Sequence, residues 1–348
     1  MLFIPSSSLL ARSPVILRIA FFLPALMAAA TAHAAPALQP AQLAVVINDD
    51  EPNSVELGEY YRTARGIPDA NIVHVRIPGK PRSLNAEQFA QLKAEIDGKL
   101  TAEVQAVLMV WTAPYAVGCN GITAAYALGY DEQQCVKTCA PGKPSPYFNA
   151  SVMPRQVQQG MRLAMLLPTD SVEEGKALID RGKASGFRVS NAGAYYLVTS
   201  EKPRNSRAQF FPKSGTIPQR KLTIHTLQAD ALEGKRDIMI YQTGKARVPK
   251  LDTLQFLPGA LADHLTSVGG DLLGEGQMSS LQWLQAGATA SYGTVSEPCN
   301  FWQKFPNPAV LLRHYANGST AIEAYWRSVA WPAQGVFIGE PLAAPYRR

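Results

Sequence analysis

Residues 43–50 have the sequence LAVVINDD, in which five apolar residues are followed directly by three polar ones. A short, continuous apolar run of this kind is typical of a strand that is buried on both faces of a parallel sheet. A helix is predicted to follow, with Asn53 as its cap and Glu56 three residues later, and to end at Gly66 and Pro68. The segment therefore predicts the first strand and the first helix of an α/β fold.

The alternation of strands and helices continues along the chain. Residues 72–77 predict a second strand, apolar residues at helical spacing between 84 and 100 predict a second helix, and residues 106–111 predict a third strand. This order predicts an α/β fold with a mostly parallel sheet flanked by helices on both faces. Further on we expect a helix from about 170 to 185, strands at 195–199 and 238–241, helices at 259–267 and 278–285, a strand at 288–295, a helical region at 308–331 and a last strand at 336–338.

Two segments interrupt this pattern, at about 118–151 and about 201–236. Neither has the composition of a linker, so we expect a single α/β domain over residues 35–348 with insertions at both places. Hydrophobic residues make up 47% of the chain and charged residues 17%. This is a globular composition, which excludes a collagen, a coiled coil and a disordered protein.

Residues 1–34 have the layout of a secretory signal peptide. Arg12 and Arg18 precede an apolar run at 19–32, and the sequence AHA ends at Ala34 as a small-residue cleavage pattern. We expect export, with cleavage near Ala34 and a periplasmic or extracellular location. No later run reaches eighteen apolar residues, so no membrane span is expected in the mature chain.

Cys119, Cys135, Cys139 and Cys299 all follow the predicted signal. An even number of cysteines in an oxidising compartment predicts disulfides, and four cysteines allow three pairings. We favour Cys119–Cys299 with Cys135–Cys139, because Cys119 and Cys299 each follow a predicted strand end. No Cys-x-x-Cys spacing occurs and no His lies near the cysteine-rich segment, so no metal site is expected.

The common catalytic and cofactor motifs are absent from the sequence. It contains no Gly-x-Gly-x-x-Gly, no Walker phosphate loop, no His-Glu-x-x-His and no Gly-x-Ser-x-Gly. We therefore expect no cofactor. Whether the protein is an enzyme stays open at this point, and if it is one, a hydrolase is expected.

Candidate catalytic residues follow from the rule that open α/β sheets bind ligands at the carboxyl ends of their strands. Asn48 and Asp49 follow the first strand, and Glu297 follows the strand at 288–295. His264 lies in a predicted helix, where Ser267 shares its face three residues later. Together they predict a hydrolase constellation that converges on one cleft. In the alternative interpretations, Asp50 and Asn53 only arrange the turn and cap the helix, Glu297 holds loop amides, and His264 has a structural role.

Between residues 202 and 221 the chain carries six basic residues and no acid. Arg204, Arg207, Arg220 and Lys221 are the candidates for binding an anionic partner, either an acidic polysaccharide or phospholipid head groups. The alternative is a solvated loop. The formal net charge is +6, of which Arg12 and Arg18 contribute two, so the mature chain carries only +4. That charge is too small for a nucleic-acid-binding protein.

Several segments resemble a family of exported bacterial proteins that occurs in species with the exosortase protein-sorting system. They are residues 45–50 with 60–68, residues 257–270, and residues 287–298, which form the most specific block. The resemblance implies a setting in envelope and exopolysaccharide biology, with acidic polysaccharide or envelope proteins as partners. It implies no particular activity.

A more distant similarity is to the gingipain-like branch of the caspase-fold cysteine peptidases. It lies in the order of the elements and in residues 338–342, IGEPL, which look like the Gly-Asp-Pro-Leu close of that branch. Those enzymes place a His-Gly after one central strand and a Cys after the next. Here residues 241–244 contain no His, and no Cys lies between them and Leu261. The resemblance therefore implies a caspase-like fold that lacks the Cys/His dyad and acts in binding or envelope assembly.

Overall fold

The computed structural model describes residues 2–3, 37–152, 161–186 and 191–347. Nearly all of the predicted signal, with its cleavage site near Ala34, lies outside the described residues. Residues Ala35–Arg348 form one compact unit. Within the described ranges, no helix combines the length and the apolar character that crossing a membrane requires.

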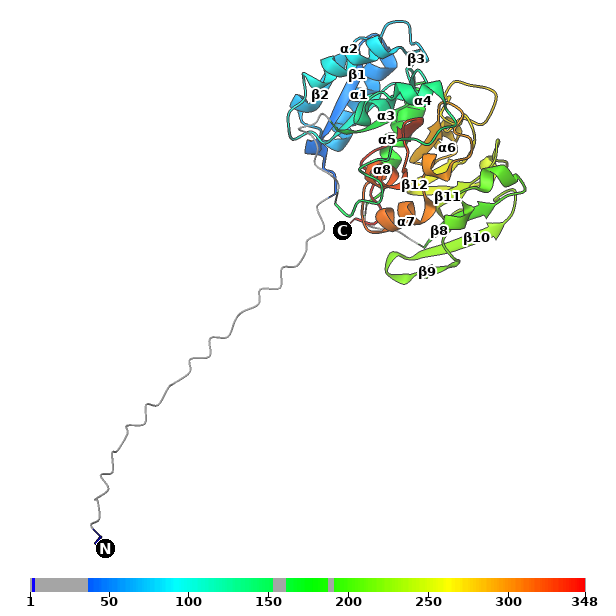
Figure 1. Ribbon diagram of the computed structural model, residues 1–348. Coiled ribbons are helices and arrows are strands. Elements are labelled where there is room, and N and C mark those ends of the chain that lie inside the picture. Colours follow the sequence, from blue (N-terminus) through cyan, green and yellow to red (C-terminus); the bar gives the residue numbers. More distant parts are fainter. Residues whose placement is uncertain (1, 4–36, 153–160, 187–190, 348) are drawn as a thin grey trace. The chain divides into compact units, whose positions relative to one another are not determined.

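The centre of the protein is an eleven-stranded, mostly parallel sheet, as predicted (Figure 1). In sheet order the strands are β2 (Ile72–Val75), β1 (Leu43–Asn48), β4 (Ala106–Val110), β7 (Leu163–Leu167), β14 (Gly335–Gly339), β13 (Ala290–Thr294), β12 (Phe256–His264), β11 (Ile238–Thr243), β8 (Ala192–Val198), β10 (Leu222–Gln228) and β9 (Gly215–Ile217). Among the described residues of this sheet, only the pairs β13–β14 and β9–β10 are antiparallel. A second, small sheet contains β3 (Ser83–Leu84), β5 (Ala116–Val117) and β6 (Asn120–Gly121).

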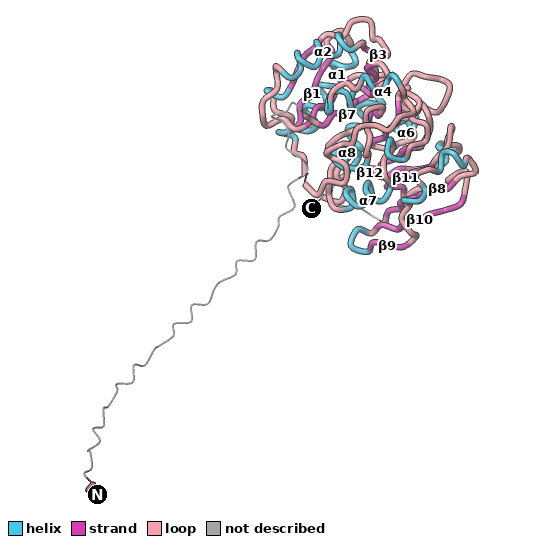
Figure 2. The backbone as a smooth tube through the Cα atoms, viewed as in Figure 1, coloured by secondary structure: helices cyan, strands magenta, loops and turns pink. Residues whose placement is uncertain are grey.

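Helices pack against the large sheet, whereas strands β9 and β10 lie at its edge (Figure 2). The α-helices of the described residues are α1 (Pro52–Arg65), α2 (Ala86–Asp97), α3 (Ile122–Leu128), α4 (Glu132–Val136), α5 (Val172–Lys183), α6 (Leu281–Gln285), α7 (Pro308–Ala316) and α8 (Ala321–Ser328). Successive strand residues point to opposite faces. Because Asp263 of β12 contacts Tyr325 of α8 while His264 contacts Trp283 of α6, α6 and α8 lie on opposite faces.

The predicted helix at 259–267 is wrong, because most of this segment belongs to strand β12. Six consecutive residues at the end of β12 are buried, since the strand is in the middle of the sheet and is covered on both faces. A strand in this position has no polar face. Its apolar run therefore looks like a buried helix in the sequence.

The strands of the small sheet and three further strands of the large sheet were not predicted. Strand β7 lies between β4 and β14, and strands β9 and β10 form one edge of the large sheet. The segment at 201–236, expected to be an insertion, therefore extends the sheet. The predicted cap of α1 is also wrong: the helix begins at Pro52 with Glu51 as its cap, and Asn53 instead donates a hydrogen bond to the carbonyl of Thr169.

Candidate functional site

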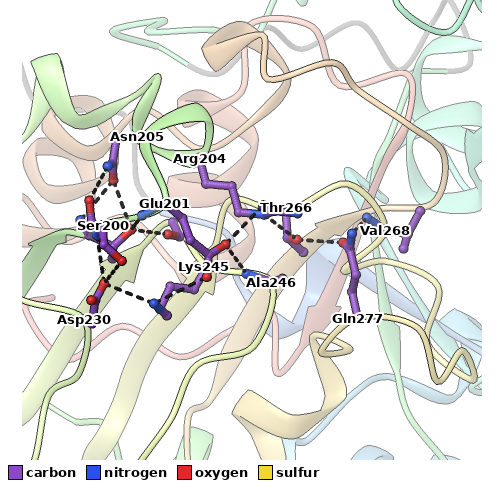
Figure 3. A network of polar contacts seen from close by, with 12 residues as sticks. Ser200, Glu201, Arg204, Asn205, Asp230, Lys245, Ala246, Thr266, Val268 and Gln277 are labelled. Carbon is purple, nitrogen blue, oxygen red and sulfur yellow. Dashed lines mark hydrogen bonds and ion pairs between the residues drawn. The ribbon is translucent and has the colours of Figure 1, made fainter.

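A polar cluster lies in the loops that follow β8, β10, β11 and β12 (Figure 3). These four strands are neighbours in the sheet and run parallel, so their carboxyl ends meet at one edge, which is where open α/β sheets bind ligands. We call this group the strand-end cluster. Its members are Ser200, Glu201, Arg204, Asn205, Asp230, Lys245, Thr266 and Gln277.

Lys245 joins two carboxylates of the strand-end cluster. Its Nζ lies 3.0 Å from Oδ1 of Asp230 and 3.4 Å from Oε1 of Glu201. The backbone N–H of Ser200 donates to the same Asp230 oxygen at 2.8 Å, and the Ser200 hydroxyl donates to it at 2.9 Å. The hydrogen bonds from the Ser200 backbone and from Lys245 lower the pKa of Asp230 to about 2. The loops after β8, β10 and β11 are therefore held together by charged groups at neutral pH.

Arg204 connects the same cluster to the end of β12. Its NH1 lies 3.1 Å from Oε2 of Glu201, and its Nε donates to the Thr266 hydroxyl at 3.2 Å. That hydroxyl donates in turn to Oε1 of Gln277 at 2.6 Å. Thr266 is buried, and its hydroxyl lies between the Arg204 guanidinium and the Gln277 amide. The strand-end cluster thus ties together the loops after β8, β10, β11 and β12.

A buried ion pair joins the loop after β8 to the carboxyl end of β12. Arg207 contacts Asp263 through its NH1 group, and both side chains are 1% exposed. Arg207 also donates to the carbonyls of Thr243 at 2.9 Å and Pro306 at 3.1 Å, while Nε2 of Gln242 donates to Asp263 at 2.9 Å. Burial raises the pKa of Asp263, against the opposing effect of Arg207. Arg207, an anion-binding candidate in the sequence, is therefore a buried partner of Asp263 and does not reach the surface.

His264 is a buried residue with both ring nitrogens in hydrogen bonds. Its Nε2 lies 3.1 Å from the carbonyl of Met278, and its Nδ1 accepts a hydrogen bond from Nε1 of Trp283 at 2.9 Å. Burial lowers the pKa of His264 to about 3. Ser267 does not share a helical face with it, because His264 is the last residue of strand β12. The geometry fits a structural, neutral histidine.

This buried histidine predicts a loss of stability in mild acid. The unfolded chain binds a proton at His264 near pH 6.5, whereas the folded chain does not until the pH approaches 3. The contribution of His264 to the free energy of unfolding is therefore fully present above about pH 6.5. Below that pH it falls by up to about 1.4 kcal/mol per pH unit. Urea unfolding at pH 7 and pH 5 should show a loss that is about 2 kcal/mol smaller in His264→Gln than in the unchanged protein. Equal losses in the two proteins would contradict the assignment.

Asn48 and Asp49 lie far from His264. Five sheet steps separate β1 from β12, which corresponds to about 24 Å across the sheet. The Asn48 side chain accepts hydrogen bonds from the backbone of Asp50 and Ile77, and Asp49 lies 2.7 Å from the His74 ring. The contact with Asp50 is that of a turn, whereas those with Ile77 and His74 tie the end of β1 to β2 and to the segment that follows it.

Glu297 lies on an exposed loop after β13, where its Oε1 accepts a hydrogen bond from the backbone of Cys299 at 2.7 Å. It therefore holds a loop amide, which is one of the two roles predicted for it. The structure does not bring Asn48, Asp49, His264 and Glu297 together in one cleft.

All four cysteines form disulfides, as predicted, but the favoured pairing is wrong. The bonds are Cys119–Cys135 and Cys139–Cys299. Cys119 lies in the turn between β5 and β6, and α4 brings Cys135 back to it. The loop after β13 also reaches this region, because the Ser296 hydroxyl donates to the carbonyl of Cys119 at 2.8 Å. The four cysteines thus share one neighbourhood, so proximity to strand ends does not choose between the pairings.

The basic segment does not form one surface. Arg204 and Arg207 lie at the carboxyl ends of the strands and have acidic partners. Lys221 lies at the opposite end, because its carbonyl accepts a hydrogen bond from Ala192, the first residue of β8. Only Arg220 and Lys221 therefore remain as candidates for binding an anion at the amino ends of β8 and β10.

Arg220 lines a groove beside α7, and this groove was not predicted from the sequence. We call it the arginine groove. Its volume is about 320 Å³, and its lining residues are Pro212, Ile217, Arg220, Ala309, Leu312, Arg313, Ala316 and Asn317. Two guanidinium groups and no carboxylate line it. The second of these, Arg313, is exposed on α7, and nothing in its local sequence distinguishes it from other basic helix residues.

The described part of the chain contains no group of three or more His, Cys, Asp or Glu side chains that could hold a metal ion. No protein-family model matches the chain, and no curated protein matches its sequence.

Among solved structures, the chain is similar to one described as "Structure of Protease", at 10% identity and a TM-score of 0.45 over 89% of this chain and 79% of that one. It is also similar to the complex of the Porphyromonas gingivalis RgpB pro- and mature domains, at 11% identity and a TM-score of 0.42 over 87% of this chain and 79% of that one. A third similar structure is the Arg-specific cysteine proteinase gingipain R, at 11% identity and a TM-score of 0.40 over 88% and 78% of the two chains. Similarity at this level assigns neither an activity nor site residues to the chain.

Proposed function

We propose that the protein is an exported, disulfide-stabilised binding protein of the cell envelope, and that its ligand is an anionic polymer held in the arginine groove. The observation that carries this proposal is the pair Arg220 and Arg313. Both guanidinium groups line one groove in which no lining residue is acidic.

The cysteines argue against a peptidase of the cysteine class. Both disulfides together use all four cysteines, so none is left as a nucleophile. At the ends of β11 and β12 the chain carries Thr243 and His264, and the latter is enclosed by α6. The strand-end cluster and the Arg207–Asp263 pair fill the edge of the sheet with structural contacts. The two disulfides also support export, because such bonds persist in oxidising compartments.

The arginine groove has the chemistry that anions need. Arginine forms paired, charge-assisted hydrogen bonds with carboxylates and phosphates. Neither Arg220 nor Arg313 forms an ion pair with a carboxylate among the described residues. Ile217 and Leu312 also line the groove, and hydrogen bonds to charged groups are stronger beside apolar side chains than in open water.

The proposal predicts that the double variant Arg220→Ala/Arg313→Ala loses affinity for polygalacturonate by roughly 100-fold. Each charge-assisted hydrogen bond contributes about 1.5 kcal/mol or more, and about 1.4 kcal/mol corresponds to tenfold in affinity. The salt dependence of binding should also become shallower, because fewer counterions are released. Isothermal titration calorimetry at several salt concentrations measures both effects.

A matched control is available at the opposite edge of the sheet. Arg76→Ala/Lys99→Ala removes the same charge from exposed positions near β2, and its affinity for polygalacturonate should stay within about twofold of the unchanged protein. An equal loss in both double variants would show that only net charge matters. That result, or no binding by the unchanged protein at low salt, would overturn the proposed function.

A further inference from the structure

Three aromatic side chains form a partly exposed group next to the arginine groove. The centroid of the Trp302 ring lies 4.5 Å from that of Phe210 and 6.5 Å from that of Phe148. The rings are tilted against each other by 54° and 50°. All three side chains are half-buried, whereas Trp111, Trp283 and Trp326 are fully buried. We call Phe148, Phe210 and Trp302 the aromatic patch.

The aromatic patch is continuous with the arginine groove along two segments. Phe210 ends a short 3-10 helix, Ala208–Phe210, and Pro212 of the groove follows two residues later. Trp302 begins the 3-10 helix Trp302–Lys304, and the chain then enters α7, which supplies Leu312 and Arg313 to the groove. The end of the groove at Pro212 therefore lies close to Phe210 along the chain, and a polymer that extends past this end of the groove would meet the aromatic patch.

A polymer that meets aromatic rings at one place and arginines at the next must present both flat apolar faces and negative charges. Pyranose rings have C–H faces that stack on aromatic side chains, and uronic acid units add one carboxylate to each ring. Polyphosphate and acidic polypeptides have the charge without a repeated ring. We therefore propose that the ligand is an acidic polysaccharide whose sugar rings stack on Trp302 while its carboxylates reach Arg220 and Arg313. This inference rests on the proposed function of the arginine groove.

Single-stranded nucleic acid also combines stacking with negative charge, but it fits this protein less well. Proteins that bind single strands place a positively charged groove along the backbone, with a phosphate at each nucleotide. The arginine groove supplies two cations, and the full chain carries a net charge of only +6. The two disulfides also place the protein in compartments where nucleic acid is not the usual partner.

The test compares three polymers and two tryptophan variants of the full chain. Polygalacturonate, polyglutamate and oligo-dT are titrated into the unchanged protein, Trp302→Ala and Trp331→Ala. Trp331 is the matched control, because it is the other half-buried tryptophan and pairs with Phe301 outside the patch. We expect Trp302→Ala to bind polygalacturonate roughly tenfold more weakly and Trp331→Ala to bind it unchanged. Polyglutamate should bind the unchanged protein weakly and should not respond to either variant.

Fluorescence provides a readout that does not depend on the stability of an alanine variant. In Trp331→Phe the other three tryptophans are fully buried, so a change in emission on adding polygalacturonate reports on Trp302. Trp302→Phe keeps a stacking ring and should retain most of the affinity. A fluorescence change in Trp331→Phe together with retained binding in Trp302→Phe supports ring stacking even if Trp302→Ala fails to fold.

The possible failures of the two proposals differ. If polygalacturonate binding needs Arg220 and Arg313 but is unchanged in Trp302→Ala, the polysaccharide inference is overturned and the groove function stands. If oligo-dT binds more tightly than polygalacturonate and depends on Trp302, the occupant is a single-stranded nucleic acid, which also overturns the inference. If none of the polymers binds at low salt, the proposed function itself fails.

Discussion

Replacing Arg207 with Met is expected to lower the free energy of unfolding by about 3 to 5 kcal/mol. Arg207 and Asp263 are each 1% exposed and form an ion pair at the middle of the sheet. Without the guanidinium, the Asp263 carboxylate loses its counter-charge at a site where burial already raises its pKa. The carbonyls of Thr243 and Pro306 also lose a donor. Urea unfolding at pH 7, followed by circular dichroism, measures the loss.

Two controls separate the charge from the side-chain volume. The double variant Arg207→Met/Asp263→Leu removes both charges and should recover part of the loss, because an apolar pair can replace a buried ion pair. Arg62→Met removes an exposed arginine whose partner Asp69 is 88% exposed, and it should cost less than about 1 kcal/mol. A loss in Arg207→Met no larger than that in Arg62→Met would contradict a stabilising role for the buried pair.

The parallel sheet could be predicted from local pattern, because strands buried on both faces have continuous apolar sequences. Strands β1 and β4 have this pattern between clear turns, and the structure confirms them. Strand β12 has the same pattern in a longer run that contains Asp263 and His264. This run was predicted to be a helix. In the structure, Asp263 is buried against Arg207 and His264 is buried against Trp283, and both partners lie elsewhere in the chain. The sequence around β12 contains no sign of either partner.

Features of the candidate site could be predicted only where they depend on residue type and not on neighbours far along the chain. Disulfide formation was predicted from four cysteines that follow the predicted signal, but the pairing depends on how α4 and the loop after β13 approach Cys119. The basic segment was visible in the sequence as well. The sequence did not show which of its arginines are buried, paired or exposed, because Asp263 lies 56 residues after Arg207 and Arg313 lies 93 residues after Arg220 along the chain. Long-range neighbours of this kind decide which charges are free to bind a ligand.

The two disulfides are expected to stabilise the protein unequally. Cys139–Cys299 closes a loop with a sequence separation of 160, whereas the separation for Cys119–Cys135 is 16. In the chain-entropy account, a disulfide destabilises the unfolded state more when it closes a longer loop. This gives roughly 5 kcal/mol for Cys139–Cys299 and roughly 3 kcal/mol for Cys119–Cys135. We expect Cys139→Ser/Cys299→Ser to lose more stability than Cys119→Ser/Cys135→Ser.

Each double variant is a control for the other, because each replaces one disulfide by two serine hydroxyls in the same region of the protein. The two loops follow one another along the chain without overlap, so their effects on the unfolded state are expected to be separate. Urea midpoints of oxidised samples, with non-reducing peptide maps to verify the remaining bond, measure the difference. A larger loss in the variant without Cys119–Cys135 would mean that folded-state contacts around α4, such as that of Cys135 with the Cys119 backbone, outweigh loop closure. In that case the stability of the cysteine-rich segment would depend on its native packing, and the long-range link between Cys139 and the loop after β13 would contribute less than its length implies.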